Sequence, residues 1–464
     1  MTAGLRATLY RGGGYLAFRQ GVGVVLSAAG VLLLTRLLGP APYGLYAAAV
    51  SLQLVLQAAA LWGVNTWLIR HDADTVEPHF AHAMGFLAVT ALLALLAGAA
   101  ALPLLERWTR LDGLAGPGLA LFAVLPLQLA ATVPLARLER ALDFRNVARV
   151  ELAGQLLFLL VAVPLAVRGA GVWAPVAGFV AQQVAQALGY FRAAHYRPRW
   201  RWSREANREM LRFGLGYSTS MWVWQGRRLV NPLVVGRLLG AEAVGYVAVA
   251  TQIATQLGFV AVAAWRLSTA ALARLQRDAE RTAAALSEGM HLQALAVGPP
   301  LVAFGWLGGW LVPLFFGADW DPVMRVYPGI AVGFLTNAVF LLHSSALYVR
   351  DRSWEVTAFH STNVGALAVA AVLLVPRYGL AGYAWAEVVA IASYLVLHGY
   401  TARRAARPDY GRVAPAWAAF ALALLLPGQP LAGLLLLAGV LALPPTRQVI
   451  GGVWREFRSQ PHGA

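Results

Sequence analysis

The chain has 464 residues, of which 59% are hydrophobic and only 12% are charged, about half the charged share of soluble domains. Apolar blocks long enough to cross a bilayer recur from end to end. This composition excludes a soluble protein and predicts an all-α polytopic membrane protein. Cysteine is absent, which excludes disulfides and thiolate metal sites, and we expect neither a metal site nor a cofactor.

The apolar blocks predict about fourteen transmembrane helices. The first is interrupted by Arg19 and is too long for a cleaved signal peptide, so we read it as a retained span. The last two are short and joined by the sequence PGQP, which is typical of a hairpin that need not cross fully. The predicted spans are 13–36, 44–69, 80–104, 115–136, 150–167, 172–191, 212–237, 244–266, 289–315, 326–349, 355–375, 381–400, 413–427 and 430–444.

The net charge is +16, and every basic residue is arginine. With both termini in the cytoplasm, 27 arginines fall in cytoplasmic segments and 7 in outer loops, as the positive-inside rule requires. The positive charge is therefore an orientation signal, and we expect no nucleic-acid partner. Trp200 and Trp202 interleave with arginines in the densest basic run, which is typical of a segment that contacts anionic membrane lipids. A topology anchor is the simpler interpretation of this run.

An internal repeat appears at a constant offset of 201 residues. The segments RLLGPAPYGLYAAA (36–49) and RLLGAEAVGYVAVA (237–250) match at seven of fourteen positions. The first span of each copy begins on the cytoplasmic side, which predicts parallel repeats, one of the layouts used by secondary transporters. We expect two parallel six-helix lobes at residues 1–200 and 201–402, followed by a C-terminal helical hairpin and cytoplasmic tail at 403–464.

Residues 32–70 and 232–254, together with the outer loop LFFGADWDPVMRVYPGIAVGF at 314–334, carry a family resemblance. They resemble the polysaccharide (O-antigen-type) flippases of the multidrug/oligosaccharidyl-lipid/polysaccharide exporter superfamily. The resemblance covers most of residues 1–400. An extra C-terminal pair of helices sets this chain apart from the usual twelve-span members; lipid II flippases also have fourteen spans.

The resemblance implies a secondary transporter of the inner membrane that acts in the biosynthesis of cell-surface polysaccharide. Such proteins turn polyprenyl-pyrophosphate-linked oligosaccharides from the cytoplasmic to the outer leaflet by alternating access. The implied partners are the lipid-linked oligosaccharide, membrane lipids and the polysaccharide polymerase or assembly proteins. Coupling to H⁺ or Na⁺ is left open.

Three arginines fall within predicted spans: Arg19, Arg227 and Arg228. Arg227 lies about 22 Å along a helix from Arg212 and about 15 Å from Arg237, too deep for easy snorkelling. Two adjacent cations at this depth need a wet cavity or a counter-ion. The guanidinium fork matches phosphate oxygens, so we predict contact with a pyrophosphate or acidic sugar. The alternatives are an ion pair with a carboxylate on a neighbouring helix and a misplaced span boundary.

Polar residues beside these arginines extend the candidate site. Arg19 is shallower and could snorkel, and Gln20, Gln225 and Asn231 could hydrogen-bond a substrate. Bonds to adjacent helices are the simpler interpretation of each amide.

Candidates for ion coupling lie in the second predicted lobe. Glu387 is the clearest carboxylate within a span, and it could bind H⁺ or Na⁺ or neutralise an arginine. His343 and His360 could titrate, although packed neutral imidazoles are the simpler interpretation.

Two other functions need weighing. A polysaccharide polymerase or lipid-linked glycosyltransferase would need a large outer catalytic loop, whereas the longest outer connections, near 105–114 and 316–325, have about ten residues. No nucleotide-binding or zinc-protease motif is present, so we expect no enzyme. A multidrug exporter of the same superfamily would be expected to carry acidic residues where this chain carries arginine.

Overall fold

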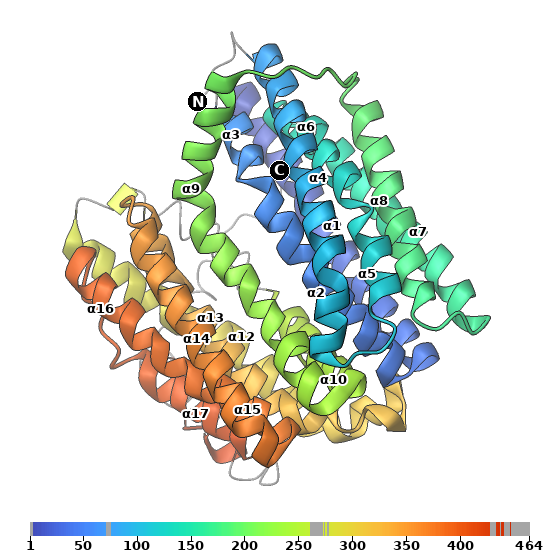
Figure 1. Cartoon of the computed structure of the whole chain (residues 1–464). Coiled ribbons are helices and arrows are strands. Elements are labelled where there is room, and N and C mark those ends of the chain that lie inside the picture. Colours follow the sequence, from blue (N-terminus) through green and yellow to red (C-terminus); the bar gives the residue numbers. More distant parts are fainter. Residues whose placement is uncertain are drawn as a thin grey trace. The chain divides into compact units, whose positions relative to one another are not determined.

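A computed structural model describes residues 3–70, 76–259, 272, 274–275, 278–426, 433–436, 438–439 and 446, without the side chains of 3–20, 70, 76–77 and 216–217. The described elements are helices, and no strand occurs among them. They fall into two compact units, and both are seen in Figure 1.

The first unit comprises Met1–Ala248 and Phe315–Trp320. Its core is apolar and is built mainly from α2, α4, α5, α6 and α8. Its elements are α1 (Ala3–Leu38), α2 (Pro40–Leu61), α3 (Val64–Arg70), α4 (Val76–Thr109), α5 (Ala115–Phe122), α6 (Leu125–Arg140), α7 (Phe144–Val167), α8 (Trp173–Ala193), α9 (Arg204–Gly226), the 3₁₀ turn η2 (Arg227–Leu229), the π-helix η3 (Asn231–Gly236), the start of α10 (Arg237–Leu257) and the 3₁₀ turn η4 (Ala318–Trp320).

The second unit comprises Val249–Leu314 and Asp321–Ala464. Helix α13 is the most buried of its candidate spans, with buried side chains from Val323 to Leu347. Its elements are the rest of α10, most of α12 (Ala279–Phe316), α13 (Val323–Tyr348), α14 (Ser353–Tyr378), α15 (Leu380–Ala390), the 3₁₀ turn η5 (Ile391–Ser393), α16 (Tyr394–Arg404) and α17 (Val413–Leu425).

Ten helices in the described part of the chain are long and apolar enough to cross a membrane. One of them, Ser218–Leu257, overlaps two of the predicted spans, 212–237 and 244–266, and α8 and α17 lie outside the ten. The predicted all-helical membrane architecture is therefore confirmed, whereas the total of fourteen spans stays a prediction. Most of the predicted span 430–444 lies outside the described residues.

The sequence repeat has a matching backbone geometry. Gly39 has φ 76° and ψ 176°, and Gly240 has φ 84° and ψ −175°. This region of backbone conformation is accessible essentially only to glycine, so each copy uses glycine to end one helix segment and begin the next. The contacts divide after Ala248 rather than at residue 200, and the boundary between the predicted lobes stays a prediction.

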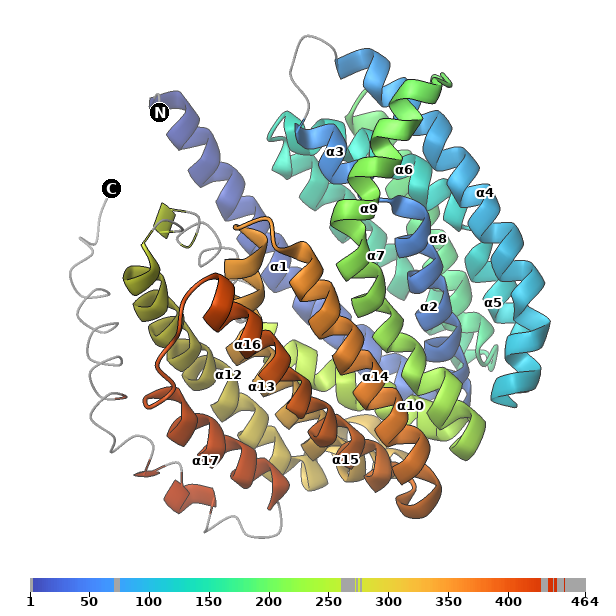
Figure 2. The same ribbon diagram turned by 60° about the vertical axis from the view of Figure 1, so that its left-hand side comes forward.

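Helices α7 and α8 form an antiparallel hairpin that both views show side by side (Figures 1 and 2). A Cβ on Gly178 would lie 2.8 Å from the carbonyl oxygen of Phe158, and one on Gly189 would lie 2.8 Å from Val150. Small residues allow two apolar helices to approach closely, which is the main source of packing energy between helices in lipid. Glycine at these positions therefore fixes the hairpin.

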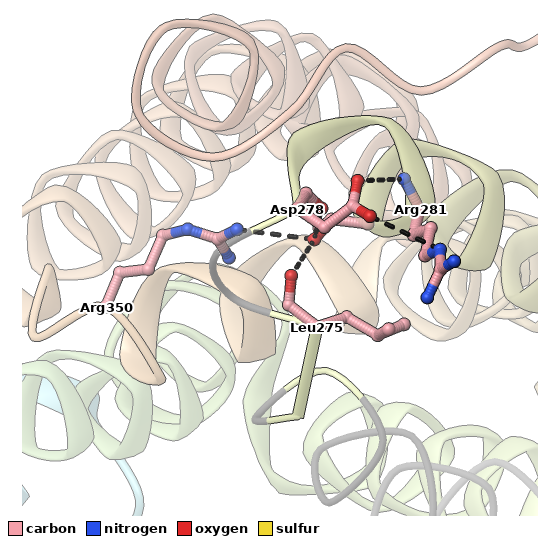
Figure 3. A network of polar contacts seen from close by, with 5 residues as sticks. Leu275, Asp278, Arg281 and Arg350 are labelled. Carbon is pink, nitrogen blue, oxygen red and sulfur yellow. Dashed lines mark hydrogen bonds and ion pairs between the residues drawn. The ribbon is translucent and has the colours of Figure 1, made fainter.

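In the second unit, a polar network encloses the start of α12 (Figure 3). Asp278 accepts a bond of 3.0 Å from the Arg281 amide and pairs with the Arg281 Nε at 3.3 Å. The buried hydroxyl of Thr282 donates to the Leu275 carbonyl at 2.9 Å and accepts from Arg350 at 3.3 Å. Burial lowers the pKa of Arg350. The network ties the turn before α14 to the first turn of α12.

Candidate substrate site

The segment that carries Arg227 and Arg228 is not a continuous α-helix. The α-helix ends at Gly226, a 3₁₀ turn spans Arg227–Leu229, and a π-helix spans Asn231–Gly236 before α10 begins. We call residues 227–236 the helix break. The expectation of one regular helix over 212–237 is wrong at this point, because short 3₁₀ and π stretches replace it. Such stretches within helices occur often at functional sites.

Pro232 explains the position of the helix break. Proline has no amide hydrogen, and its ring clashes with the carbonyl group four residues earlier, here that of Arg228. Proline also disfavours the α conformation at the preceding residue, here Asn231. The α-helical hydrogen bond from residue 232 to residue 228 is therefore impossible, and the backbone changes its winding around the arginine pair.

The part of α9 just before the break is fixed against α2. Trp222 donates its indole N–H to the Ala58 carbonyl at 2.8 Å. Its ring meets that of Trp62 edge-on, with centroids 4.7 Å apart. A Cβ on Gly214 would lie 2.7 Å from the Trp62 carbonyl oxygen. These contacts place the arginines on a rigid support within the first unit.

The two arginines have different surroundings. Arg228 is exposed on the protein, and its Nε donates to Gln225 Oε1 at 3.3 Å. Within the described part of the chain, its two Nη groups make no further hydrogen bond or ion pair. Arg227 is half-buried, with its guanidinium carbon 5.7 Å from the Trp224 ring centroid. Arg228 is thus the better placed of the two to bind an anion.

The neighbouring amides serve the protein itself. Gln225 orients Arg228 through the bond just described. Asn231 donates from Nδ2 to the Val244 carbonyl at 3.1 Å, which holds the π-helix against α10. Its Oδ1 atom is buried and has no hydrogen-bond partner within the described residues. The Asn231 bond is a contact with another helix, whereas the Gln225 bond stays within one segment, and the contact of both amides with substrate stays a prediction.

Trp108 and Arg237 close the far end of the helix break. The Trp108 indole donates to the Leu233 carbonyl at 3.2 Å, inside the π-helix. Arg237 donates to the Trp108 carbonyl at 2.7 Å and lies 4.3 Å from the indole centroid. The Arg237 amide bonds to the Val234 carbonyl, so the Leu233 carbonyl lacks its usual α-helical donor and receives the Trp108 indole N–H in its place. The repeat arginine Arg237 acts here as a structural clamp.

Arg19 and Gln20 lie on α1. Their side chains lie outside the described residues, so their predicted contact with substrate stays a prediction.

Glu387 is buried on α15, with 4% of its surface exposed. A Cβ on Gly333 of α13 would lie 3.1 Å from Glu387 Oε2, so glycine makes room for the carboxylate. Near the end of α15, Asn363 Nδ2 donates to Ser393 Oγ at 2.9 Å and to the Ala390 carbonyl at 3.3 Å. The α-helix that carries this carboxylate ends at Ala390, and the 3₁₀ turn Ile391–Ser393 follows it directly.

His343 and His360 differ in their surroundings. His343 is fully buried on α13, and its Nε2 atom lies 2.8 Å from the hydroxyl of Tyr410. The same hydroxyl lies 2.7 Å from Nδ1 of His398 on α16. Burial raises the pKa of the Tyr410 phenol. His360 lies on α14 beside Phe359, with ring centroids 5.1 Å apart.

Several polar residues of the structure escaped the sequence patterns. The Gln53 amide donates to Gln128 Oε1 at 2.6 Å between two buried side chains. Tyr410 and His398 lie far from His343 in sequence, so no local spacing connects them. Pro232 was a usable signal for the helix break, because proline within an apolar span interrupts regular winding. No cluster of three or more metal-binding side chains occurs among the described residues.

Comparison with known proteins places residues 33–325 within the family model described as polysaccharide biosynthesis protein. The succinoglycan biosynthesis transport protein ExoT of Rhizobium meliloti is 24% identical over 299 residues, which cover 62% of this chain and 59% of that protein. The matched region thus spans about three fifths of this relative's length.

Solved structures share the fold at low sequence identity. The lipid II flippase MurJ, in an inward closed conformation, matches with a TM-score of 0.70 and 12% identity, covering 95% of this chain and 99% of that chain. An inward-facing multidrug resistance transporter of the MATE family and MOP superfamily matches with a TM-score of 0.56 and 16% identity, covering 82% and 93%. Transporter relatives and repeated apolar helices indicate a multi-pass membrane protein.

Proposed function

We propose that this chain, which belongs to the polysaccharide biosynthesis protein family and has the fold of the MOP-superfamily transporters, flips a lipid-linked oligosaccharide across a membrane. The cargo would be a polyprenyl-pyrophosphate-linked glycan, moved from the cytoplasmic to the outer leaflet for cell-surface polysaccharide synthesis. The observation that carries the proposal is the pair of adjacent arginines on the helix break within a candidate span. The relatives found are transporters rather than enzymes, which supports the same interpretation.

The role of the arginine pair follows from its chemistry. A guanidinium group is permanently charged and presents paired donors that fit two oxygens of one phosphate. Arg228 keeps its Nη donors available within the described part of the chain, and Gln225 holds its Nε side. We assign Arg228 to bind a pyrophosphate oxygen directly. Arg227, partly covered by Trp224, would add positive charge next to it.

The rest of the transport cycle is proposed from the sequence. The chain would lie in the inner membrane with both termini in the cytoplasm, and two parallel lobes would alternate access to the bound headgroup. Arg19 and Gln20 would contribute further contacts to the cargo. The buried carboxylate of Glu387 is a candidate for coupling to H⁺ or Na⁺.

The test is reconstitution of the purified full-length chain in liposomes with a fluorescent polyprenyl-pyrophosphate oligosaccharide. A membrane-impermeant glycan-modifying reagent then measures how fast the labelled lipid reaches the other leaflet. We expect faster movement than in protein-free liposomes, and no comparable movement of a neutral lipid-linked glycan. Equal movement of both lipids, or export of a cationic dye in place of the anionic lipid, would contradict the proposal.

A further inference from the structure

Three side chains from three separate segments of the second unit meet around one hydroxyl group. His343 comes from α13, His398 from α16, and Tyr410 from the segment between α16 and α17. The Tyr410 oxygen lies 2.8 Å from His343 Nε2 and 2.7 Å from His398 Nδ1. We call these three residues the His–Tyr–His chain. Both distances are those of ordinary hydrogen bonds.

The His–Tyr–His chain allows two opposite hydrogen-bond directions. A phenol has one O–H to donate, so one of its two hydrogen bonds must come from an imidazole N–H. Either Tyr410 donates to His343 and accepts from His398, or it donates to His398 and accepts from His343. These two arrangements differ only in the positions of protons along the chain.

We propose that the His–Tyr–His chain is a proton relay between His398 and the buried side of His343. In the forward step, a proton from solvent binds His398 Nε2, and His398 Nδ1 passes its proton to the Tyr410 oxygen. The O–H bond of Tyr410 breaks as its proton binds His343 Nε2, and His343 releases the proton of Nδ1 to a water molecule that reaches this nitrogen when the surroundings of α13 change. One proton enters and one leaves, and every heavy atom keeps its place. This relay goes beyond the flipping of the cargo and does not depend on which lipid is carried.

The burial of His343 gives the relay an end point. Its side chain has no exposed surface, and Nδ1 is a buried nitrogen without a hydrogen-bond partner within the described residues. A buried polar group without a hydrogen-bond partner is energetically unfavourable. A conformation that brings water or a polar group to Nδ1 removes this cost. Proton release at Nδ1 is therefore linked to a change in the surroundings of α13.

Aromatic packing holds the rings in line. Phe340 lies one turn before His343 on α13, with ring centroids 4.7 Å apart. Its ring is stacked against Tyr410 at 6.0 Å and an interplanar angle of 27°. The phenol can therefore rotate its O–H bond while its ring stays fixed. Replacement of Tyr410 by phenylalanine would keep this packing and remove only the hydroxyl.

No carboxylate forms an ion pair with either imidazole within the described part of the chain. A neutral relay is thus favoured over a fixed ion pair. The titratable and charged side chains on the elements packed around the chain include the buried Glu387 on α15, which lies against Gly333 of α13. They also include Glu280, Arg281, Glu288 and His291 on α12, Glu355, His360 and Arg377 on α14, Arg403 and Arg404 on α16, and Arg407, Asp409 and Arg412 in the segment that carries Tyr410.

The relay can be tested by nuclear magnetic resonance on the full-length chain in lipid bilayers, with ¹⁵N-labelled histidine. The chain has nine histidines, so His343→Gln and His398→Gln variants assign the two rings. Spectra between about pH 5 and 8 cover the range in which histidine titrates. We expect the ring proton of His343 to move between Nδ1 and Nε2 as the pH changes. The midpoint of this change should be the pH at which the signals of His398 change.

Two variants complete the experiment. In Tyr410→Phe, we expect the His343 signals to stop following the titration of His398, while Tyr400→Phe, on α16, leaves the coupling intact. A His343 ring that keeps one tautomer throughout the range in the unaltered chain would overturn the proposal, and so would full coupling in Tyr410→Phe. The tautomer of His343 is measured in the unaltered chain, so this test stands even if Tyr410→Phe fails to fold. Coupled signals in a chain that fails to flip the lipid would refute the proposed function alone.

Discussion

Gly44 and Gly245, which occupy equivalent positions in the two copies of the repeat, lie against each other in the first unit. A Cβ on Gly44 would lie 2.8 Å from the Gly245 amide nitrogen and would collide with the Ala241 carbonyl. A Cβ on Gly245 would lie 2.6 Å from the Pro40 carbonyl oxygen. The repeated motif is therefore a packing surface in which backbone meets backbone. This contact accounts for the glycine that both copies share.

Replacing Gly44 or Gly245 by alanine should destabilise the first unit. The added methyl group meets backbone atoms that cannot rotate away, and overpacking of this kind typically costs about 1–3 kcal/mol. Thermal unfolding in detergent, followed by size-exclusion chromatography, measures the loss. Gly365→Ala is the matched control, because its Cβ would meet nothing within 4 Å. Equal stability of Gly44→Ala and the control would contradict this packing.

Replacing Trp108 by phenylalanine should loosen the helix break. The variant keeps an aromatic ring beneath the Arg237 guanidinium and removes the donor to the Leu233 carbonyl. We expect a loss of about 1 kcal/mol in unfolding free energy, the usual net contribution of one hydrogen bond. Trp310→Phe is the control, since Trp310 is 66% exposed. Hydrogen exchange at residues 233–237 should rise in the first variant only; unchanged exchange there would count against the clamp.

The buried pair of Gln53 and Gln128 should show strong energetic coupling. Changing either residue to leucine leaves its partner buried without a hydrogen bond, which costs about 1–3 kcal/mol. Changing both removes the polar groups together, so the double variant should be less destabilised than the sum of the single variants. A double-mutant cycle on unfolding temperatures measures this coupling. Additive effects would show that the bond of 2.6 Å contributes nothing specific.

Thr282→Val should weaken the network at the start of α12 (Figure 3). Valine fills the same space but cannot donate to the Leu275 or Asp278 carbonyls, at 2.9 and 2.7 Å, or accept from Arg350. The expected loss is about 1–3 kcal/mol, because Thr282 is fully buried. Thr255→Val is the control: its hydroxyl donates to the Thr251 carbonyl at an exposed position. If both variants lower the unfolding free energy equally, the buried network does not contribute more stability than an exposed hydrogen bond.

Composition and long apolar blocks predicted the all-helical membrane architecture, because a membrane span must satisfy its backbone hydrogen bonds internally. The repeat at an offset of 201 residues also aligns Gly39 with Gly240, which adopt the same backbone conformation. Both signals can be read directly from the order of residues, the first within one apolar block and the second by comparing two segments. They are therefore visible without knowledge of tertiary packing.

The residues that escaped prediction are joined by tertiary contacts. Trp108 and Leu233 are 125 positions apart, and His343 and Tyr410 are 67 positions apart. No spacing rule connects such pairs, because their distance is set by how helices pack. Pro232 is the exception: its effect on the backbone is local, and it explains the change of winding beside the arginine pair.

The central claim is that the arginines of the helix break bind an anionic lipid headgroup. The direct measurement is the rate of flipping of a fluorescent polyprenyl-pyrophosphate oligosaccharide by Arg227→Gln and Arg228→Gln variants in liposomes, at matched protein content. Arg168→Gln, in the exposed connection between α7 and α8, is the control. We expect a loss of about tenfold or more in Arg228→Gln, from the removal of a charged hydrogen bond of about 1.5–3 kcal/mol, a smaller loss in Arg227→Gln, and an unchanged rate in the control. Rates equal to that of the unaltered chain in both variants would contradict the account.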